Sequence, residues 1–300
     1  MRVVAHGGVG GPASHADGCR AAVQAVLAAL DAADLALDAA VAGAVILEDD
    51  PRFNAGTGSS YRLDGKTIEM DAAVMDGGGR IGAVAAIRRV KNPVLVARRV
   101  ADSPHILLAG EPAVRFARAQ GFPDHDPATR EAREKYEEVV RQLTKGEVPP
   151  SRRRWLEIDL SKFWNFEVPY AKLAPTGTIG VAVHALGRTA VALSTGGASP
   201  MLAGRVGDTP LPGAGFWAGP AGSVAATGIG EEIARKLLSK WVYDRIEEGA
   251  SPAGACREGV ALYPDEIPIG LIAVTPAGWG AANNREMPWA AWTGDALVGP

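Results

Sequence analysis

Two stretches of alternating hydrophobic residues, joined by a tight turn, constrain the fold of this chain more than any other feature. They are TIGVAVHA at residues 178–185 and TAVALSTGG at residues 189–197. Alternation with a period of two predicts strands, and the short Leu-Gly-Arg connection at 186–188 predicts that the strands run antiparallel. We therefore predict a β-hairpin that begins at Thr178.

Groups of strands and groups of helices surround this hairpin. Before it, the pattern predicts a strand at 3–5, helices at 17–33 and 38–48, strands at 67–76 and 81–90, a helix from Asn92-Pro93, a strand at 106–108 and a helix at 111–122. After it, we expect a strand near Phe216, helices at 231–241 and 252–262, and a hairpin within 269–284. Such grouping favours an α+β fold with two stacked, mainly antiparallel sheets and outer helices, and the length of 300 residues allows one large domain or two small ones.

The segment from Pro123 to Gly177 differs in composition from the rest of the chain. A charged, helix-like run occupies about 127–145, and an irregular aromatic stretch follows it. Neither part alternates as a core strand would. We interpret the segment as a long, partly mobile linker, and the arginines at 152–154 as a solvated charge run rather than a recognition patch.

Charge and composition argue against several kinds of partner. The chain has 31 basic and 34 acidic residues and a net charge of -3, which gives no field that would attract nucleic acid or an anionic membrane. Its most apolar stretch, 35–50, is interrupted by Asp38 and is too short to cross a bilayer, and the N-terminus breaks into glycines before a signal peptide could form. Two cysteines, Cys19 and Cys256, are too few for a disulfide scaffold, so we expect a cytoplasmic protein.

Two threonines draw attention to the predicted hairpin as a site. Thr178, Gly180 and Ala182 share one face of the first strand, so small neighbours leave space beside the Thr178 hydroxyl. Thr195 ends the second strand at about the level of Thr178, which sets a second hydroxyl beside the first. A single threonine at the start of a strand is more typical of structure than of catalysis, and the groups near this one raise the odds of a catalytic role.

Two further motifs carry groups that suit an amino-acid substrate. Arg205 and Asp208 lie three residues apart in a loop rich in glycine and proline, and together they offer a fork for a carboxylate and an acceptor for an ammonium group. An ordinary surface ion pair is the alternative. Thr227 and the N–H of Gly228 precede a predicted helix, where an oxyanion would be stabilised, although such a motif is often only a helix-entry turn.

These motifs follow one another in an order that resembles a known family. HGGVGG, LEDDPRFNAGTGS, EMDAAVMDG, TIGVAV, STGG, GRVGDTPLPGAG and ATGIGEE occur in this order along the chain. The chain resembles the plant-type L-asparaginase and isoaspartyl peptidase family of N-terminal nucleophile hydrolases over nearly all of its length except 123–177. The resemblance implies a four-layer αββα sandwich in one domain of residues 1–300.

The resemblance also implies that the chain is a precursor that cuts itself between Gly177 and Thr178. The products would be a fragment of residues 1–177 and a fragment of residues 178–300 that carries the nucleophile. Glycine can adopt the strained conformation that brings its carbonyl onto the Thr178 hydroxyl. The α-amine released at Thr178, with an ordinary pKa of roughly 7.7–8.0, can then accept the proton of its own hydroxyl.

By resemblance, the mature enzyme hydrolyses L-asparagine to aspartate and ammonia, or β-aspartyl dipeptides, through an acyl-enzyme on Thr178. Thr195 would orient the nucleophile, and the Thr227 hydroxyl and Gly228 N–H would form the oxyanion hole. Asn54 matches the residue that approaches the nucleophile from the first fragment.

The remaining roles implied by the resemblance concern binding and assembly. Arg205 would hold the α-carboxylate of the substrate and Asp208 its α-ammonium. No cofactor is expected for catalysis, and the protein is expected to be a homodimer of two-fragment protomers. A structural sodium ion, which oxygen ligands without an open position suit, would be held by the main-chain carbonyls of Leu47, Glu48, Asp50, Phe53, Ala55 and Thr57.

Some residues depart from the family pattern. The run ASPMLAGR after STGG differs from that of relatives, and Trp217 replaces a usual Tyr, so we expect both to reshape the leaving-group side of the pocket. Asp50 stands where many relatives have Cys. Gly177 and STGG, in place of Asp and STNG, disfavour the glycosylasparaginase branch. Two alternatives stay open: a glycosylasparaginase-like amidase, and an unprocessed, non-catalytic amino-acid-binding protein that uses Arg205 and Asp208.

Two other enzyme classes lack support in the sequence. The five histidines have neither HExxH nor any paired spacing, which disfavours a zinc enzyme, and no G-x-S-x-G elbow of a serine hydrolase occurs. His6 is expected to form a hydrogen bond within the first glycine turn, and His184 to lie near a strand end. The others are His15, His105 and His125.

Overall fold

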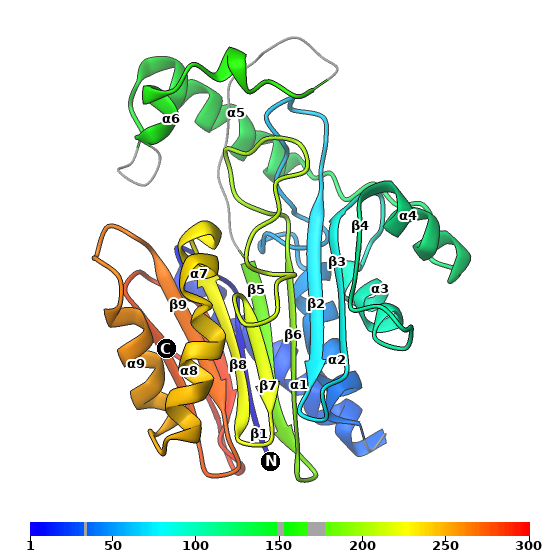
Figure 1. Cartoon of the computed structure of the whole chain (residues 1–300), viewed down its shortest axis with the longest axis vertical. Helices are drawn as coiled ribbons and strands as arrows, with labels where there is room; N and C mark the ends of the chain where they lie inside the picture. The colour runs from blue at the N-terminus through cyan, green and yellow to red at the C-terminus, as the bar shows by residue number, and fades with distance from the viewer. Residues whose placement is uncertain (33–34, 149–152, 167–177) are drawn as a thin grey trace.

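Two sheets packed face to face form the centre of the molecule (Figure 1). The computed structural model describes residues 1–32, 35–148, 153–166 and 178–300. The larger sheet contains, in spatial order, β12 (Leu297–Val298), β11 (Trp289–Trp292), β1 (Arg2–His6), β5 (Thr178–Ala185), β6 (Arg188–Thr195), β2 (Met70–Asp76), β3 (Ile81–Ile87) and β4 (Leu107–Ala109). The smaller sheet contains β10 (Trp279–Asn283), β9 (Ile269–Val274), β8 (Gly222–Gly228) and β7 (Phe216–Gly219). The β3–β4 pair is parallel and the other pairs are antiparallel.

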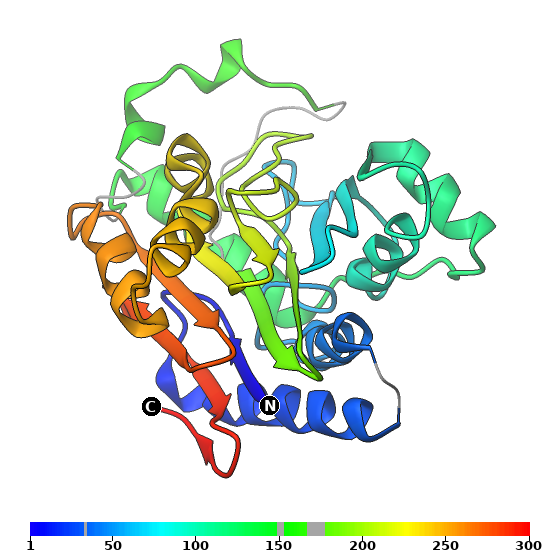
Figure 2. The same ribbon diagram turned by 60° about the horizontal axis from the view of Figure 1, so that its bottom comes forward.

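Helices cover the outer face of each sheet, which gives four layers. The larger sheet carries α1 (Ala16–Ala32), α2 (Ala36–Asp49) and α3 (Pro93–Val100), and the smaller sheet carries α8 (Leu238–Glu247) and α9 (Pro252–Ala261). In Figure 2 the blue helices α1 and α2 lie on one side of the strands and the gold and orange α8 and α9 lie on the other. The predicted α+β sandwich of two stacked, mainly antiparallel sheets is confirmed.

The remaining helices lie at the ends and edges of these layers. Among the described residues they are α4 (Gly110–Ala119), α5 (Arg130–Lys145), α6 (Arg154–Glu157), α7 (Gly230–Lys236) and the short 3-10 helices Ala13–His15 and Leu160–Lys162.

Alternation along the central strands explains the layers. In β5, Val181 belongs to the hydrophobic core beneath the helices of the larger sheet, whereas Ala182 faces the smaller sheet. In the layer between the sheets, Leu193, Phe216 and Ile272 are completely or almost completely buried. Each such side chain contributes about 1.5–3 kcal/mol to stability by leaving water, so this layer holds the two sheets together.

The predicted hairpin is confirmed, with its turn one residue shorter than expected. β5 and β6 pair from Thr178 opposite Thr195 to Ala185 opposite Arg188. Leu186 and Gly187 form the two-residue connection, and both have positive φ, 54° and 70°. Positive φ at both central positions suits the twist of antiparallel strands. The turn therefore fixes the register that sets the two threonines side by side.

The C-terminal half differs from the predictions at three points. The helix predicted at 231–241 is two helices, α7 and α8, because Leu237 between them adopts a left-handed conformation with φ of 47°. Thr227 and Gly228 end strand β8 rather than standing in a simple turn. Strands β11 and β12 were not predicted, because their short runs are held by pairing with β1 and with each other rather than by local pattern.

The described parts of the segment 123–177 pack on a small hydrophobic cluster of their own. The charged run forms α5, as predicted, and its Leu143 is buried against Leu63. Trp155 and Trp164 pack around this pair, so the aromatic residues of the segment have a local core. Arg153 is exposed, in agreement with a solvated charge run, while residues 149–152 and 167–177, with Gly177 among them, lie outside the described residues.

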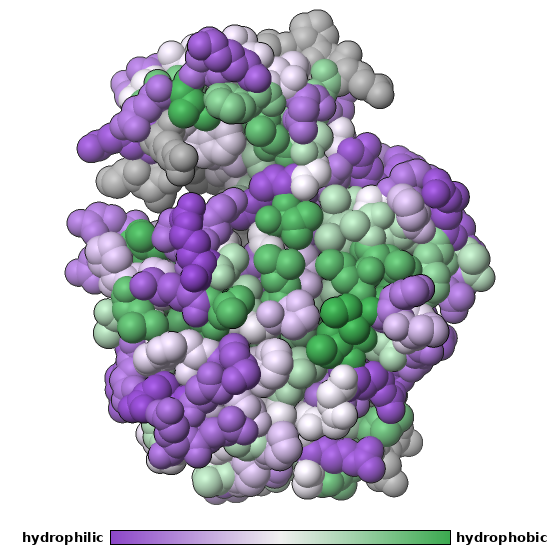
Figure 3. Space-filling view, in the orientation of Figure 1, coloured by the Kyte–Doolittle hydropathy of each residue, from purple (hydrophilic) through white to green (hydrophobic). Residues whose placement is uncertain are grey.

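Hydrophilic and hydrophobic residues are unevenly distributed over the face of the molecule drawn in Figure 3. In the view of Figure 3, hydrophilic residues cover most of the periphery and hydrophobic residues gather around β2, β3 and α3. None of the described helices combines the length and the hydrophobicity that crossing a bilayer requires.

The layer between the sheets makes a direct stability prediction. Replacing Leu193 by Ala should lower the free energy of unfolding by about 2–5 kcal/mol, because a fully buried side chain is removed from a packed layer. The same replacement at Leu186, which is 60% exposed in the hairpin turn, should change it by about 0.5 kcal/mol or less. Urea denaturation of both variants measures the difference, and equal effects would contradict the packing described here.

Candidate active site

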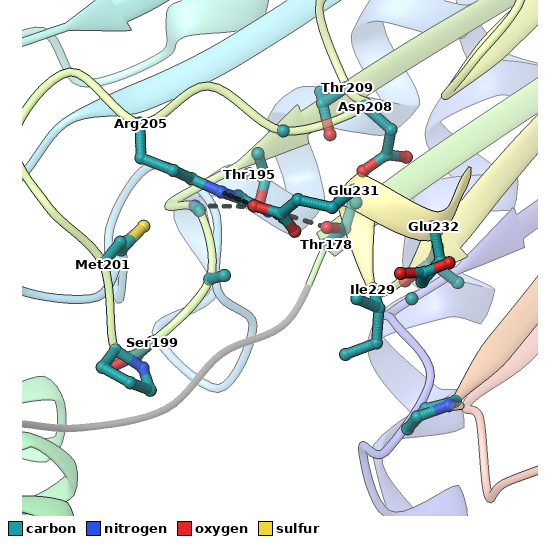
Figure 4. Close-up of a pocket in the computed structure, with 18 of the residues that line it drawn as sticks. Thr178, Thr195, Ser199, Met201, Arg205, Asp208, Thr209, Ile229, Glu231 and Glu232 are labelled. Carbon is teal, nitrogen blue, oxygen red and sulfur yellow. Dashed lines mark hydrogen bonds and ion pairs between the residues drawn. The ribbon is translucent and has the colours of Figure 1, made fainter. Parts of the chain in front are cut away.

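A cavity of about 700 Å³ opens where β5 begins, β6 ends and β8 ends. Thr178 and Thr195 line it from the hairpin, Thr227 and Gly228 from the end of β8, and Arg205 and Asp208 from the loop between β6 and β7. Figure 4 shows the labelled side chains around one space. Six of the predicted catalytic and substrate-binding residues are thus brought together from three separate parts of the chain.

The two threonine hydroxyls are in contact. Thr178 Oγ1 donates to Thr195 Oγ1 at 3.2 Å, and Thr195 Oγ1 also accepts from the N–H of Gly197 at 3.0 Å. Thr178 is 8% exposed and Thr195 is 2% exposed. A hydroxyl that is buried beside a second hydroxyl and still borders a cavity has a fixed orientation and restricted contact with water, as a nucleophile needs.

The N-terminal glycine turn presses against the backbone of Thr178. Gly8 has φ of 99°, and a Cβ on it would lie 2.6 Å from the Thr178 carbonyl oxygen and 3.0 Å from its nitrogen. Its N–H donates to His6 Nδ1 at 3.1 Å, which confirms the hydrogen bond predicted for His6. Burial lowers the pKa of His6 to about 3, so the ring is neutral and Nδ1 can accept. The HGG motif predicted the hydrogen bond of His6, but not the contact of Gly8 with the backbone of Thr178.

Asn54 supports the loop that follows Thr195. Its side-chain Nδ2 donates to the main-chain carbonyl of Gly197 at 2.8 Å. Its main-chain carbonyl accepts from the N–H of Gly196 at 2.9 Å. A Cβ on Gly196 would lie 2.5 Å from Asn54 Oδ1, so only glycine permits this approach. Asn54 therefore reaches the nucleophile region from the first half of the chain, as predicted, and its described contacts hold the STGG segment.

The end of β8 offers donors toward the cavity. Strand β7 pairs with β8 only as far as Ala225, so Thr227 and Gly228 extend beyond the neighbouring strand. Thr227 Oγ1 accepts from the N–H of Val9 at 3.3 Å, which leaves its own proton available for donation. This arrangement can stabilise negative charge on an oxygen bound in the cavity.

Arg205 is held by a carboxylate that the sequence did not predict. Its Nε and Nη2 donate to the two oxygens of Glu231 at 2.9 and 2.8 Å. A Cβ on Gly230 would lie 2.8 Å from Arg205 Nη2 and from Asp208 Oδ1, so glycine makes room for both groups. A guanidinium has five N–H donors, so three remain for a second anion. Figure 4 shows the Glu231 carboxylate against the guanidinium of Arg205.

Asp208 is a buried carboxyl with an unfilled acceptor. It is 4% exposed, and its Oδ2 has no hydrogen-bond partner among the described residues. Burial raises its pKa to about 7, although the nearby Arg205 opposes the rise. A cationic group bound beside Oδ2 would satisfy this oxygen and favour its ionised form. The pair Arg205 and Asp208 therefore suits a ligand with adjacent negative and positive groups.

Of the two sequence features expected to shape the leaving-group side of the cavity, one lines the cavity and the other does not. Pro200 and Met201, in the unusual run ASPMLAGR, line the cavity. Trp217 does not; its ring packs 6.3 Å from that of Tyr243, with the ammonium of Lys240 above it. The prediction that Trp217 shapes the pocket is wrong, because alternate residues of a strand face opposite sides. Apolar side chains from the segment before Thr178 complete this wall: Trp155, Ile158 and Phe163.

In the loop proposed to hold sodium, two glycines pack closely against main-chain carbonyl oxygens. A Cβ on Gly58 would lie 2.7 Å from the Phe53 carbonyl oxygen, and one on Gly56 would lie 2.6 Å from that of Glu48. Both glycines have positive φ, 107° and 50°. The side chain of Asp50 pairs with Arg52, so the residue that replaces Cys is not required inside the loop. Gly56 and Gly58 therefore allow the loop to fold tightly around the Glu48 and Phe53 carbonyls.

Other ligand sets find no support in the described residues. No group of three or more His, Cys, Asp or Glu side chains that could hold a metal ion occurs in the described ranges. His184 lies in β5, near its end, as predicted.

Comparisons with known proteins identify the family of this chain. A sequence model of the family described as Asparaginase matches residues 5–298. The "Plant-type L-asparaginase" of Pyrococcus horikoshii is 38% identical over 265 residues, which cover 85% of this chain and 82% of the relative. The "Isoaspartyl peptidase" of Salmonella typhimurium is 39% identical, over 88% of this chain and 82% of the relative. The "Isoaspartyl peptidase/L-asparaginase" of Xenopus laevis is 36% identical, over 98% of this chain and 93% of the relative.

A family model that spans almost the whole chain agrees with relatives at 36–39% identity over most of their length. The cavity carries the threonines and the charged pair that the motifs of the sequence predicted. The chain belongs to the asparaginase family and is a hydrolase.

Proposed function

We propose that this protein is a threonine amidohydrolase that cuts its own chain and then hydrolyses L-asparagine, β-aspartyl dipeptides, or both. One observation carries the proposal: the Thr178 hydroxyl lies 3.2 Å from that of Thr195, in a cavity that Arg205 and Asp208 also line. The names of the relatives, plant-type L-asparaginase and isoaspartyl peptidase, support both substrate classes.

Substrate binding uses the two charged groups of the loop between β6 and β7. Arg205 binds the α-carboxylate through N–H groups that Glu231 leaves available. Asp208 accepts from the α-ammonium through its unfilled Oδ2. Held at these two groups, the substrate directs its side-chain carbonyl toward Thr178.

Self-cleavage supplies the base. The Thr178 hydroxyl attacks the carbonyl carbon of Gly177, the peptide nitrogen leaves as the amine of Thr178, and water hydrolyses the resulting ester. The new α-amine has an ordinary pKa of roughly 7.7–8.0, so a useful fraction is neutral near pH 7.5. It is attached to the nucleophile itself and needs no other side chain to position it.

Hydrolysis then proceeds in two steps. The α-amine takes the hydroxyl proton as Thr178 Oγ1 bonds to the side-chain carbonyl carbon of the substrate, and Thr227 and the N–H of Gly228 stabilise the oxygen that becomes negative. The amine returns the proton to the leaving nitrogen, and ammonia or the amine of a peptide departs. Water attacks the ester in the same way, with its proton passing through the amine to Oγ1, and aspartate leaves.

We further propose that the loop of residues 47–57 holds a sodium ion through its main-chain carbonyls. The tight turn that brings the Glu48 and Phe53 carbonyls close to Gly56 and Gly58 supports this proposal. Such an ion would neutralise the dipoles of clustered carbonyls. The loop carries Asn54, which holds the STGG segment in its turn.

Self-cleavage gives the first prediction of this function. Purified protein should separate into fragments of residues 1–177 and 178–300, and sequencing of the second should begin Thr-Ile-Gly-Val. Thr178→Ala should leave an intact chain with no detectable turnover of asparagine or β-aspartyl dipeptides, because both reactions use the same hydroxyl. Thr178→Ala protein that is cleaved and active would contradict the proposal, and wild-type protein that stays intact and inert would favour an amino-acid-binding protein.

The raised pKa of Asp208 predicts how product affinity varies with pH. The carboxyl has a pKa of about 7 in the free site, so lowering the pH below 7 neutralises it and removes the partner of the ligand ammonium. The competitive inhibition constant of L-aspartate should therefore be about tenfold higher at pH 6 than at pH 8. Asp208→Asn should bind more weakly at both pH values, with a nearly constant inhibition constant; an unchanged pH profile in that variant would remove Asp208 from this role.

We also propose that two cleaved protomers form a homodimer, as the family resemblance implies. Ile106, just before the edge strand β4, and Leu107, its first residue, are exposed, which leaves apolar area for an interface. Light scattering on a size-exclusion column should give about twice the 31.1 kDa mass of one chain. A mass of one chain across the micromolar range would contradict this proposal.

A further inference from the structure

A fully buried arginine that takes no part in the proposed chemistry lies behind the cavity. Arg62 is 0% exposed and is the largest completely buried side chain among the described residues. It follows Tyr61, which forms an isolated antiparallel bridge with Ile68. A guanidinium is costly to bury, so its presence here calls for partners that use its charge and its shape.

Glu69 is the first partner of this arginine and is shared with the substrate-binding loop. Arg62 Nε donates to Glu69 Oε2 at 2.9 Å, and the same oxygen accepts from the N–H of Gly204 at 2.7 Å. Gly204 directly precedes Arg205. The other oxygen of Glu69 accepts from Arg88 Nε at 3.0 Å, so the carboxylate is satisfied from both sides.

The other nitrogens of Arg62 reach the same loop and the loop after Thr195. Nη2 donates to the main-chain carbonyl of Arg205 at 3.4 Å, and Nη1 contacts Met201 Sδ. A Cβ on Gly197 would lie 2.6 Å from Nη1. One planar group therefore contacts the chain at 197, 201 and 205, which spans the whole connection from the nucleophile-orienting segment to the carboxylate-binding residue.

These contacts fix the main chain on both sides of Arg205. Its carbonyl is held by Arg62 Nη2, and the preceding N–H is held by Glu69, which Arg62 orients. The side chain is held from the opposite direction by Glu231. Arg62 is not among the residues that line the cavity, so it acts on a ligand through lining residues that it contacts, and Arg205 is the one among them that carries charge.

We propose that Arg62 is a positioning residue that sets Arg205 for the α-carboxylate of the substrate. This inference rests on the proposed function, in which Arg205 binds that carboxylate. The fork of the guanidinium carries the effect, because three of its nitrogens contact three different points. A lysine at position 62 would keep the charge and lose this geometry.

The experiment compares steady-state kinetics of self-cleaved wild type, Arg62→Lys and Arg88→Lys with L-asparagine. Arg88→Lys is the matched control, because Arg88 also pairs with Glu69 but is half exposed, and its described contacts go to Glu69 alone. Arg62→Lys should raise KM about tenfold or more while kcat changes less than about threefold, since the nucleophile and its base are untouched. Arg88→Lys should leave both values within about twofold of wild type.

Self-cleavage and thermal unfolding of the same variants separate positioning from damage to the fold. Arg62→Lys should still produce the fragment that begins at Thr178. If kcat and the extent of self-cleavage fall while KM rises, the inference is overturned in favour of a structural role. An unchanged KM would overturn it outright. If Arg62→Lys does not fold, Glu69→Gln, which keeps the shape of the carboxylate and weakens its hold on Arg62 and Gly204, should raise KM in the same direction, and an unchanged KM there counts against the inference.

Arg205→Lys distinguishes failure of this inference from failure of the proposed function. If Arg205→Lys leaves KM unchanged, Arg205 does not bind the α-carboxylate and the proposed role of the loop is wrong. If Arg205→Lys raises KM and Arg62→Lys does not, only the positioning role of Arg62 is wrong.

Discussion

The antiparallel pairing of β5 with β6 is the interaction on which the rest of the structure depends. Its register sets Thr178 opposite Thr195 and sends alternate side chains to the helices on one side and to the smaller sheet on the other. A slip of one residue would turn the Thr178 hydroxyl away from the cavity and move the hydrophobic residues of β5 to the wrong layer. The core and the nucleophile are therefore specified by the same constraint.

The absence of side chains at a few positions is what allows the site to assemble around this pair. Gly8 brings the first turn of the chain against the backbone of Thr178, Gly196 admits Asn54, and Gly230 leaves room for Arg205 and Asp208. Each glycine joins a segment that is distant in sequence to the end of the hairpin. Polar groups without a full set of partners line the resulting cavity. Asp208 contributes an oxygen that has no hydrogen-bond partner among the described residues, and the end of β8 contributes donors.

The sequence pattern predicted the parts of the structure that interactions between neighbouring residues determine. The alternation of 178–195 gave the hairpin, and the motif residues of the charged loop and of β8 were found because their types and order match a family. The break at Leu237 was not predicted, because a left-handed residue other than glycine is stabilised by its surroundings rather than by its own preference. Glu231 and Arg62 were missed because both act on Arg205 from a distance along the chain. Glu231 lies 26 residues from Arg205 and Arg62 lies 143 residues from it, and neither spacing produces a local pattern.

The most direct test of the central claim is to trap and locate the covalent intermediate. Cleaved protein is mixed with an excess of L-asparagine, quenched in acid within the first turnover, and analysed by intact mass and peptide mapping. The account predicts that the fragment of residues 178–300 gains the mass of one aspartyl group and that this group maps to Thr178. An aspartyl group on any other residue, or rapid turnover under conditions in which no covalent adduct can be detected, would contradict it.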